Sequence, residues 1–214
     1  MKANRSDLFL NVASFATHTQ ALGPGLRSVI WVQGCPIHCK GCIAPDWIPM
    51  ESAMRMWPDE IIERVLFDNI TGLTFSGGEP MEQAEGLAEV ARLARQRRDI
   101  DIICFTGYQY ERLLKNPPNK SVGELLAEID VLIDGPFIQA LNDSIGLRGS
   151  SNQRVIHLTS KLKEHDFESY TRKVEIRVTD GELAFIGIPT PGIVSAMERA
   201  TSAYIERKEH NERS

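Results

Sequence analysis

Residues 34–42 read Gly34-Cys35-Pro36-Ile37-His38-Cys39-Lys40-Gly41-Cys42, which places three cysteines at the spacing C-x3-C-x2-C in a chain that has only four. Three thiolates on one short loop can hold three corners of a cubane iron-sulfur cluster. Such clusters normally take four cysteines, so one iron is left without a protein ligand. An open metal position is typical of catalytic centres. The loop therefore favours an enzyme whose substrate or cofactor completes the cluster.

Two other interpretations of the loop remain open at this point. His38 lies among the cysteines, so Cys35, His38, Cys39 and Cys42 also suit a structural zinc site of the Cys3His type. A disulfide with one leftover thiol is the second alternative. The amino terminus has no charged-then-apolar signal segment, which favours a cytoplasmic protein with reduced thiols.

Composition indicates an ordinary globular chain and excludes some partners. With 214 residues, of which 42% are hydrophobic, the chain is long enough for one good core and an appendage. No stretch approaches the roughly 20 apolar residues of a membrane span. The net charge of -5 argues against nucleic-acid binding, which calls for clustered Lys and Arg. We expect the short basic run at 95–98 to complement a helix dipole.

Strand-like and helix-like segments alternate along the chain. This order predicts an α/β fold with a parallel sheet, covered by helices and curled into an open or closed barrel. In such folds the loops at the carboxyl ends of the strands form the active site. The cysteine loop and the turns at 76–80, 106–108 and 134–135 all follow predicted strands, so we expect them on one rim. The strands are expected at 28–32, 73–75, 100–105 and 131–133, and the helices after 57, around 87–94, after 108 and at 122–128.

Six segments together resemble the radical S-adenosylmethionine superfamily. Within it the chain is most similar to the glycyl-radical-enzyme activases, the family of the anaerobic ribonucleoside-triphosphate reductase activating proteins. The resemblance spans Leu8 to His157. The segments are Gly23–Arg27, Gly34–Cys42, Ser76–Pro80, Phe105–Tyr108, Val131–Phe137 and Arg148–Gln153.

The resemblance implies a radical S-adenosylmethionine oxidoreductase with a partial, open β/α barrel. In that family the three cysteines of the loop, Cys35, Cys39 and Cys42, hold a catalytic [4Fe-4S] cluster. S-adenosylmethionine chelates the fourth iron and is cleaved reductively to a 5'-deoxyadenosyl radical. A reducing protein such as flavodoxin or ferredoxin supplies the electron.

The other site residues are likewise carried over from the resemblance. Gly77 and Gly78 let the backbone approach the methionine moiety, Glu79 accepts from its ammonium group, and Pro80 stiffens the turn. Gly41 and Ile43 flank the adenine. Thr106 and Asp134 are candidates for the ribose or methionine end, although a plain turn hydroxyl is an equal interpretation of Thr106.

The chain departs from the wider superfamily at two positions. Gly41 stands where many radical enzymes have an aromatic residue, and Pro136 stands where several relatives have a lysine. The contact to the cofactor carboxylate is therefore open, with Arg148 and Arg154 as substitutes or as ties for their loops. The fourth cysteine, Cys104, is expected to be a buried structural thiol, which leaves thiols for one cluster.

Residues 158–214 form a C-terminal extension to the core at 1–157. Alternation at 173–178 and 182–187 around Thr179-Asp180-Gly181 predicts a hairpin, followed by a helix after Pro191 and a frayed end near 206–209. The extension either caps the open side of the barrel or docks a partner. The leading function is installation of a glycyl radical on a partner enzyme. A small-molecule or peptide substrate is the second hypothesis, and a zinc or iron-sulfur interaction module is the third.

Overall fold

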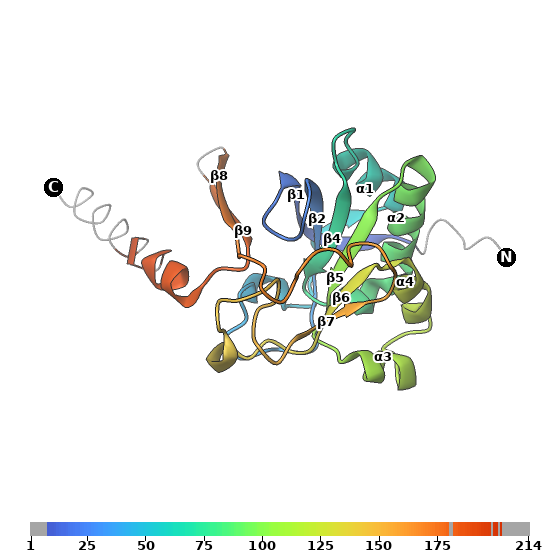
Figure 1. The fold of residues 1–214 in the computed structure, drawn as a ribbon. Helices are drawn as coiled ribbons and strands as arrows, with labels where there is room; N and C mark the ends of the chain where they lie inside the picture. Colours follow the sequence, from blue (N-terminus) through green and yellow to red (C-terminus); the bar gives the residue numbers. More distant parts are fainter. Residues whose placement is uncertain (1–7, 180–181, 198, 201, 203–214) are drawn as a thin grey trace.

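A computed structural model describes residues 8–179, 182–197, 199, 200 and 202. Its centre is a seven-stranded sheet in the order β3-β1-β2-β4-β5-β6-β7 (Figure 1). The sheet ends at β3 and β7 and is open, so the described residues form an α/β fold without a closed barrel. The strands are β1 (Leu10–Thr19), β2 (Arg27–Val32), β3 (Met54–Met56), β4 (Gly72–Gly77), β5 (Asp101–Phe105), β6 (Val131–Asp134) and β7 (Arg154–His157).

The four central strands β2, β4, β5 and β6 run parallel, as the alternation of segments predicts. The flanking strands β1, β3 and β7 are antiparallel to their neighbours, so the sheet is mixed rather than parallel throughout. None of these three strands was predicted from the sequence. β1 alternates only partly between buried and half-buried positions and contains two irregularities of register, which weakens its strand pattern.

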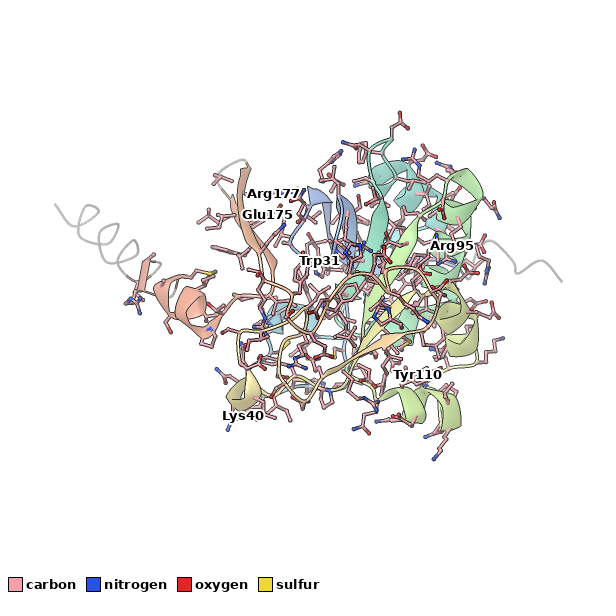
Figure 2. The ribbon with its side chains drawn as sticks, in the orientation of Figure 1. Trp31, Lys40, Arg95, Tyr110, Glu175 and Arg177 are labelled. Carbon is pink, nitrogen blue, oxygen red and sulfur yellow. The ribbon has the colours of Figure 1, made fainter. Side chains whose placement is uncertain are left out.

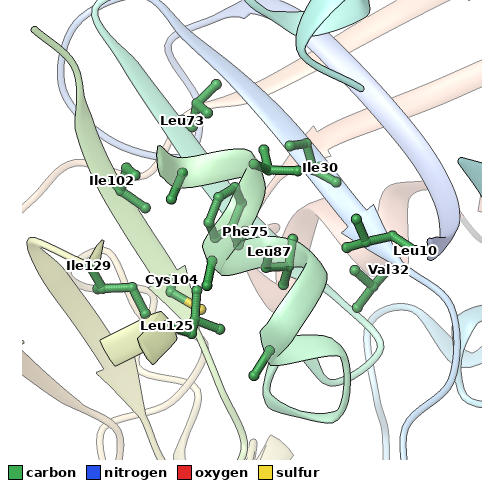
Figure 3. Close-up of a cluster of buried hydrophobic side chains, with 14 of the residues drawn as sticks. Leu10, Ile30, Val32, Leu73, Phe75, Leu87, Ile102, Cys104, Leu125 and Ile129 are labelled. Atoms are coloured by element: carbon green, nitrogen blue, oxygen red, sulfur yellow. The ribbon is translucent and has the colours of Figure 1, made fainter. Parts of the chain in front are cut away.

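Helices cover one face of the sheet. They are α1 (Pro58–Val65), α2 (Ala84–Arg97), α3 (Tyr110–Lys115) and α4 (Val122–Glu128). The 3-10 turns η2 (Pro45–Trp47), η3 (Pro80–Gln83) and η4 (Gln139–Leu141) lie in the loops after β2, β4 and β6. The buried side of α2 packs on the strands, where Leu87 lies near Phe75 (Figure 3). Cys104 belongs to the same cluster and is fully buried, which confirms that it is a core thiol. Burial raises its pKa well above the usual value.

The C-terminal extension covers the opposite face. Leu162, Phe167 and Ile188 share a second buried cluster with Trp31 and Ile133 of the sheet. The predicted hairpin is confirmed as β8 (Val174–Thr179) paired with β9 (Glu182–Gly187), and residues 191–197 are helical, as expected after Pro191. The turn at 180–181 and the end near 206–209 lie outside the described residues. No helix in the described ranges is long and apolar enough to cross a membrane.

A buried arginine ties the amino-terminal ends of the parallel strands together. Arg27 is completely shielded from solvent and pairs with Asp101 at 2.5 Å. Its guanidinium also donates to Thr74 Oγ1 (2.9 Å) and to the carbonyl of Leu73 (2.6 Å). Gly72 leaves room for this group, because a Cβ there would lie 2.2 Å from Arg27 Nη1. Together these contacts compensate the buried positive charge of the Arg27 guanidinium.

We expect Arg27→Ala to destabilise the metal-free protein by about 3–5 kcal/mol, because it leaves the Asp101 carboxylate in a largely buried place without its counter-ion. Urea unfolding under reducing conditions measures the change. The control is Arg97→Ala, which breaks an exposed pair with Glu63 and should cost less than about 1 kcal/mol. Equal losses in the two variants would contradict the role of Arg27.

Candidate active site

Four loops meet at the carboxyl ends of the parallel strands, as the sequence predicts. They follow β2, β4, β5 and β6 and hold residues 33–50, 78–83, 106–109 and 135–153. Main-chain hydrogen bonds join them, such as Glu79 N to Gly34 O (2.9 Å) and Gly135 N to Tyr108 O (3.1 Å). Lys40 of the first loop and Tyr110 beyond the third lie along the same edge of the molecule (Figure 2).

The cysteine loop is held at its base by its own following segment. Gly34 N donates to Trp47 O (2.9 Å) and Cys35 N donates to Ile48 O (3.0 Å). Positive φ angles at Gly34 (96°), His38 (52°) and Gly41 (75°) turn the chain sharply. As a result Cys35, Cys39 and Cys42 are half-buried free thiols on one short turn.

Local electrostatics at the thiols combine burial with main-chain donors. Burial raises the pKa of Cys35, while the backbone N–H groups of Ile37 and His38 oppose the rise. Burial also raises the pKa of Cys39, and the backbone N–H of Phe137 opposes it. A bound cation would deprotonate such thiols outright. Three half-buried free thiols on one short turn are thus a donor set that fits a metal cluster.

The geometry at the loop is not that of a single-ion site. Among the residues that the structure describes, no three His, Cys, Asp or Glu side chains converge closely enough to hold one metal ion. His38 is exposed. A cubane cluster gives each cysteine a different iron, so its ligands need not converge on one point.

Gly77, the last residue of β4, and Gly78 directly after it both pack against main chain. A Cβ at Gly77, whose φ is +107°, would lie 2.5 Å from Val32 N, and one at Gly78 would lie 2.3 Å from Gly34 O. The amide of Gly78 donates to Val32 O at 2.7 Å. These positions must therefore lack side chains so that the turn can lie directly beneath the cysteine loop. Close approach to the methionine moiety remains a prediction.

Glu79 is buried and already has donors on both of its oxygens. Oε1 accepts from Met81 N (2.9 Å) and from Thr106 Oγ1 (2.7 Å), and Oε2 accepts from Gly107 N (2.8 Å). Burial raises the pKa of Glu79 to about 7, although these hydrogen bonds oppose the rise. The carboxyl thus clamps the loop after β4 to the loop after β5. Pro80, also buried, begins η3.

Thr106 belongs to this clamp. Besides its bond to Glu79, its hydroxyl accepts from Tyr108 N (3.1 Å). This bond within the turn is the plain turn role that the sequence also allowed for Thr106. The neighbouring Gly107 approaches the cysteine loop, since a Cβ there would lie 2.4 Å from Ile37 Cδ1. Glu79, Thr106 and Gly107 together therefore join three of the four loops.

Asp134 is a tie between β6, β7 and α3. It is buried, accepts from Tyr110 N (2.7 Å) and pairs with Arg154 through both oxygens, with Nε 3.0 Å from Oδ1. Arg154 also binds Glu111. Arg148 pairs with Asp143 and Glu168. Both arginines thus tie loops together, which is one of the two roles that the sequence leaves open for them.

The structure adds two residues that no pattern in the sequence singles out. The backbone N–H of Phe137 opposes the rise in the pKa of Cys39, and Gln139 lies against Gly41, where a Cβ would be 2.4 Å from its Oε1. Both belong to the loop after β6. A backbone donor leaves no signal in side-chain chemistry, so only the Val131–Phe137 likeness hinted at this loop. Ile43 of the cysteine loop, by contrast, has a side chain that is 45% exposed.

Comparison with known proteins places this arrangement in a family. Residues 21–156 match the family model described as "4Fe-4S single cluster domain". The anaerobic ribonucleoside-triphosphate reductase-activating protein of Vibrio cholerae is 37% identical over 145 residues, which cover 63% of this chain and 89% of that protein. The chain belongs to the radical S-adenosylmethionine activase family. The activating protein of the same name from Escherichia coli K12 is 33% identical over 146 residues, covering 64% and 91%.

A second branch of this activase family also matches. The pyruvate formate-lyase-activating enzyme of Clostridium pasteurianum is 34% identical over 103 residues, or 44% of this chain and 43% of that enzyme. As a member of the family, the chain is an enzyme with a [4Fe-4S] cluster and S-adenosylmethionine as cofactors. The family confirms a [4Fe-4S] cofactor against the zinc alternative, and the assignment of Cys35, Cys39 and Cys42 as its ligands stays a prediction. All four cysteines are free thiols, so the disulfide alternative is wrong.

We expect Gly78→Ala to lower the stability of the metal-free activase by about 1–3 kcal/mol, because its methyl group would collide with the Gly34 carbonyl. The cysteine loop should shift with it, so iron content after anaerobic reconstitution should fall. Gly123→Ala in α4 is the control, since no atom lies within 4 Å of its Cβ position. That change should stabilise by about 0.5–1 kcal/mol.

The raised pKa of Glu79 makes stability depend on pH. The folded state binds this proton more tightly than the unfolded chain, whose carboxyl titrates near 4.5. The resulting stabilisation is full below pH 4.5 and is lost as the pH rises to about 7. Relative to Glu79→Gln, the wild type should lose about 3 kcal/mol across this window. Urea unfolding of both metal-free proteins measures it, and a constant difference would contradict it.

Proposed function

We propose that this enzyme installs a glycyl radical on a large partner protein, an anaerobic ribonucleotide reductase or a related glycyl-radical enzyme. The observation that carries the proposal is the cysteine loop seated on the Gly77–Pro80 turn, in a chain similar to activating proteins of that reductase. When bound, the cluster and S-adenosylmethionine supply a 5'-deoxyadenosyl radical that takes a Cα hydrogen from glycine. A cytoplasmic donor such as flavodoxin or ferredoxin would provide the electron.

Each rim residue has a proposed share in this function. Cys35, Cys39 and Cys42 would hold the cluster and leave one of its irons free for S-adenosylmethionine. Gly41 and Ile43, partly exposed beside them, suit contact with the adenine. Since the Glu79 carboxyl is occupied by three internal donors, we assign it, with Thr106 and Asp134, to fixing the loops, and leave cofactor contact to exposed main chain.

The surface around the mouth supports a protein as the substrate. Ile43, Ile138 and Leu141 are 45%, 41% and 42% exposed, and Gln139 between the last two lies against Gly41. Apolar side chains gathered at a site indicate a binding surface. A glycine-bearing loop held there would be shielded from water, which a carbon radical requires.

The C-terminal extension covers the sheet face opposite the helices. This cover supports a partial barrel whose entrance lies at the rim formed by the four loops. Residues of the extension at 158–188 fill the space over Trp31 and Ile133. We propose that residues 1–157 form the catalytic core as a partial barrel, and that 158–214 are an extension that caps its open side. Entry would then be limited to the cysteine end.

Cys39→Ser should abolish formation of 5'-deoxyadenosine and of the glycyl radical, because the cluster loses one of three ligands. Dithionite-reduced, anaerobically reconstituted protein is assayed with the partner, and the radical is detected by electron paramagnetic resonance. Cys104→Ala, a buried cysteine away from the loop, is the control and should retain both activities. Cleavage by wild type without a glycyl signal on any glycyl-radical partner would instead favour a small-molecule or peptide substrate.

A further inference from the structure

Arg172 of the C-terminal extension is embedded in the rim loop that follows β6. Its side chain is only 2% exposed, and its guanidinium faces the Asp143 carboxylate, with Nη2 3.6 Å from Oδ1. The guanidinium also donates to four oxygens of the loop, which are Asn142 Oδ1 (2.6 Å), Ile145 O (3.2 Å), Gly146 O (3.2 Å) and Arg148 O (2.5 Å). Because a guanidinium carries its donors in a fixed fork, it holds several points of the loop at once.

Two neighbouring residues of the extension join the same loop. Leu147 N donates to Phe167 O (2.9 Å), and Glu168 pairs with Arg148 at 3.0 Å. Gly146, whose φ is +71°, leaves room for this contact, because a Cβ there would lie 2.8 Å from Glu168 O. The extension and the rim loop are therefore packed main chain against main chain.

The loop depends on these contacts because it has no regular structure of its own. Residues 142–149 form neither helix nor strand, so no ladder of main-chain hydrogen bonds fixes their shape. Ile145 within this stretch is 51% exposed, and Gln139 just before it lies against Gly41 of the cysteine loop. The position of this apolar surface beside the cysteines therefore depends on Arg172.

We propose that Arg172 is a positioning residue that holds the loop at 138–149 in the shape that receives the partner enzyme, and that it thereby determines partner recognition. The inference rests on the proposed function and deepens it. Arg172 lies beyond residues 21–156, the stretch that matches the family model, so the extension adds a determinant of specificity to the shared core. Without Arg172 the loop adopts several shapes, and part of the binding free energy is lost in ordering it.

Two arginines of the extension provide the first test. Arg172→Met keeps the length of the side chain and removes its donors, whereas Arg177→Met removes a guanidinium that binds Glu175 and His18 O, far from the rim. Each full-length, anaerobically reconstituted variant is titrated with purified anaerobic ribonucleotide reductase of the same organism, and the rate of glycyl radical formation gives kcat and KM. We expect Arg172→Met to raise KM about tenfold with little change in kcat, because it weakens binding and not the chemical step. Arg177→Met should leave both unchanged.

Amide hydrogen exchange across 142–149 in the metal-free protein is the second measurement, and it needs neither cluster nor partner. Arg172→Met should accelerate exchange there about tenfold, and Arg177→Met should not. Arg172→Lys keeps the buried charge but has three donors instead of five, so its effects on exchange and KM should be smaller. This variant still gives an answer where Arg172→Met fails to fold.

An unchanged KM or unchanged exchange in both Arg172 variants, an equal change in Arg177→Met, or a fall in kcat without a rise in KM would overturn the inference. A wild type that cleaves S-adenosylmethionine but forms no glycyl radical on any glycyl-radical enzyme would instead refute the proposed function. In that case accelerated exchange in Arg172→Met would still support the positioning role, and unchanged exchange would refute it.

Discussion

The contact between two stretches of main chain, at Gly78 and Gly34, is the constraint on which the site depends. No side chain separates them, and hydrogen bonds from Gly78 N to Val32 O and from Glu79 N to Gly34 O close the contact. The turn after β4 is thus a platform for the cysteine loop. Glu79 then extends the platform to the loop after β5, so the position of each loop depends on its neighbour.

The centre of the fold was predictable from sequence because each element carries a local pattern. The strand at 131–133 is continuously apolar, and the helix at 122–128 matches the observed α4. The Gly-Gly-Glu-Pro turn was also predictable, because glycine pairs and proline restrict the backbone strongly. The cysteines needed only their spacing. What these features share is that their cause lies within a few residues.

The remaining features arise from contacts between distant segments. β7 is short and only half-buried, so its pattern does not reveal the partner β6. The clamp role of Glu79 depends on Thr106 and Gly107, 27 and 28 residues away. The effect of Phe137 on the pKa of Cys39 comes from a backbone N–H, which every residue except proline has. The carboxylates of Glu79 and Asp134 suggested contacts to the cofactor. Both side chains are buried, however, and their oxygens are hydrogen-bonded to neighbouring parts of the protein.

The second buried cluster couples the stability of the sheet to that of the C-terminal extension. Trp31 at the end of β2 and Ile133 on β6 are shielded by Leu162, Phe167 and Ile188, all from beyond the stretch that matches the family model. A gene shortened to the length shared with the family would expose this apolar layer to water. The extension therefore carries part of the folding free energy of the catalytic half, and any change to it would reach the cysteine loop through β2.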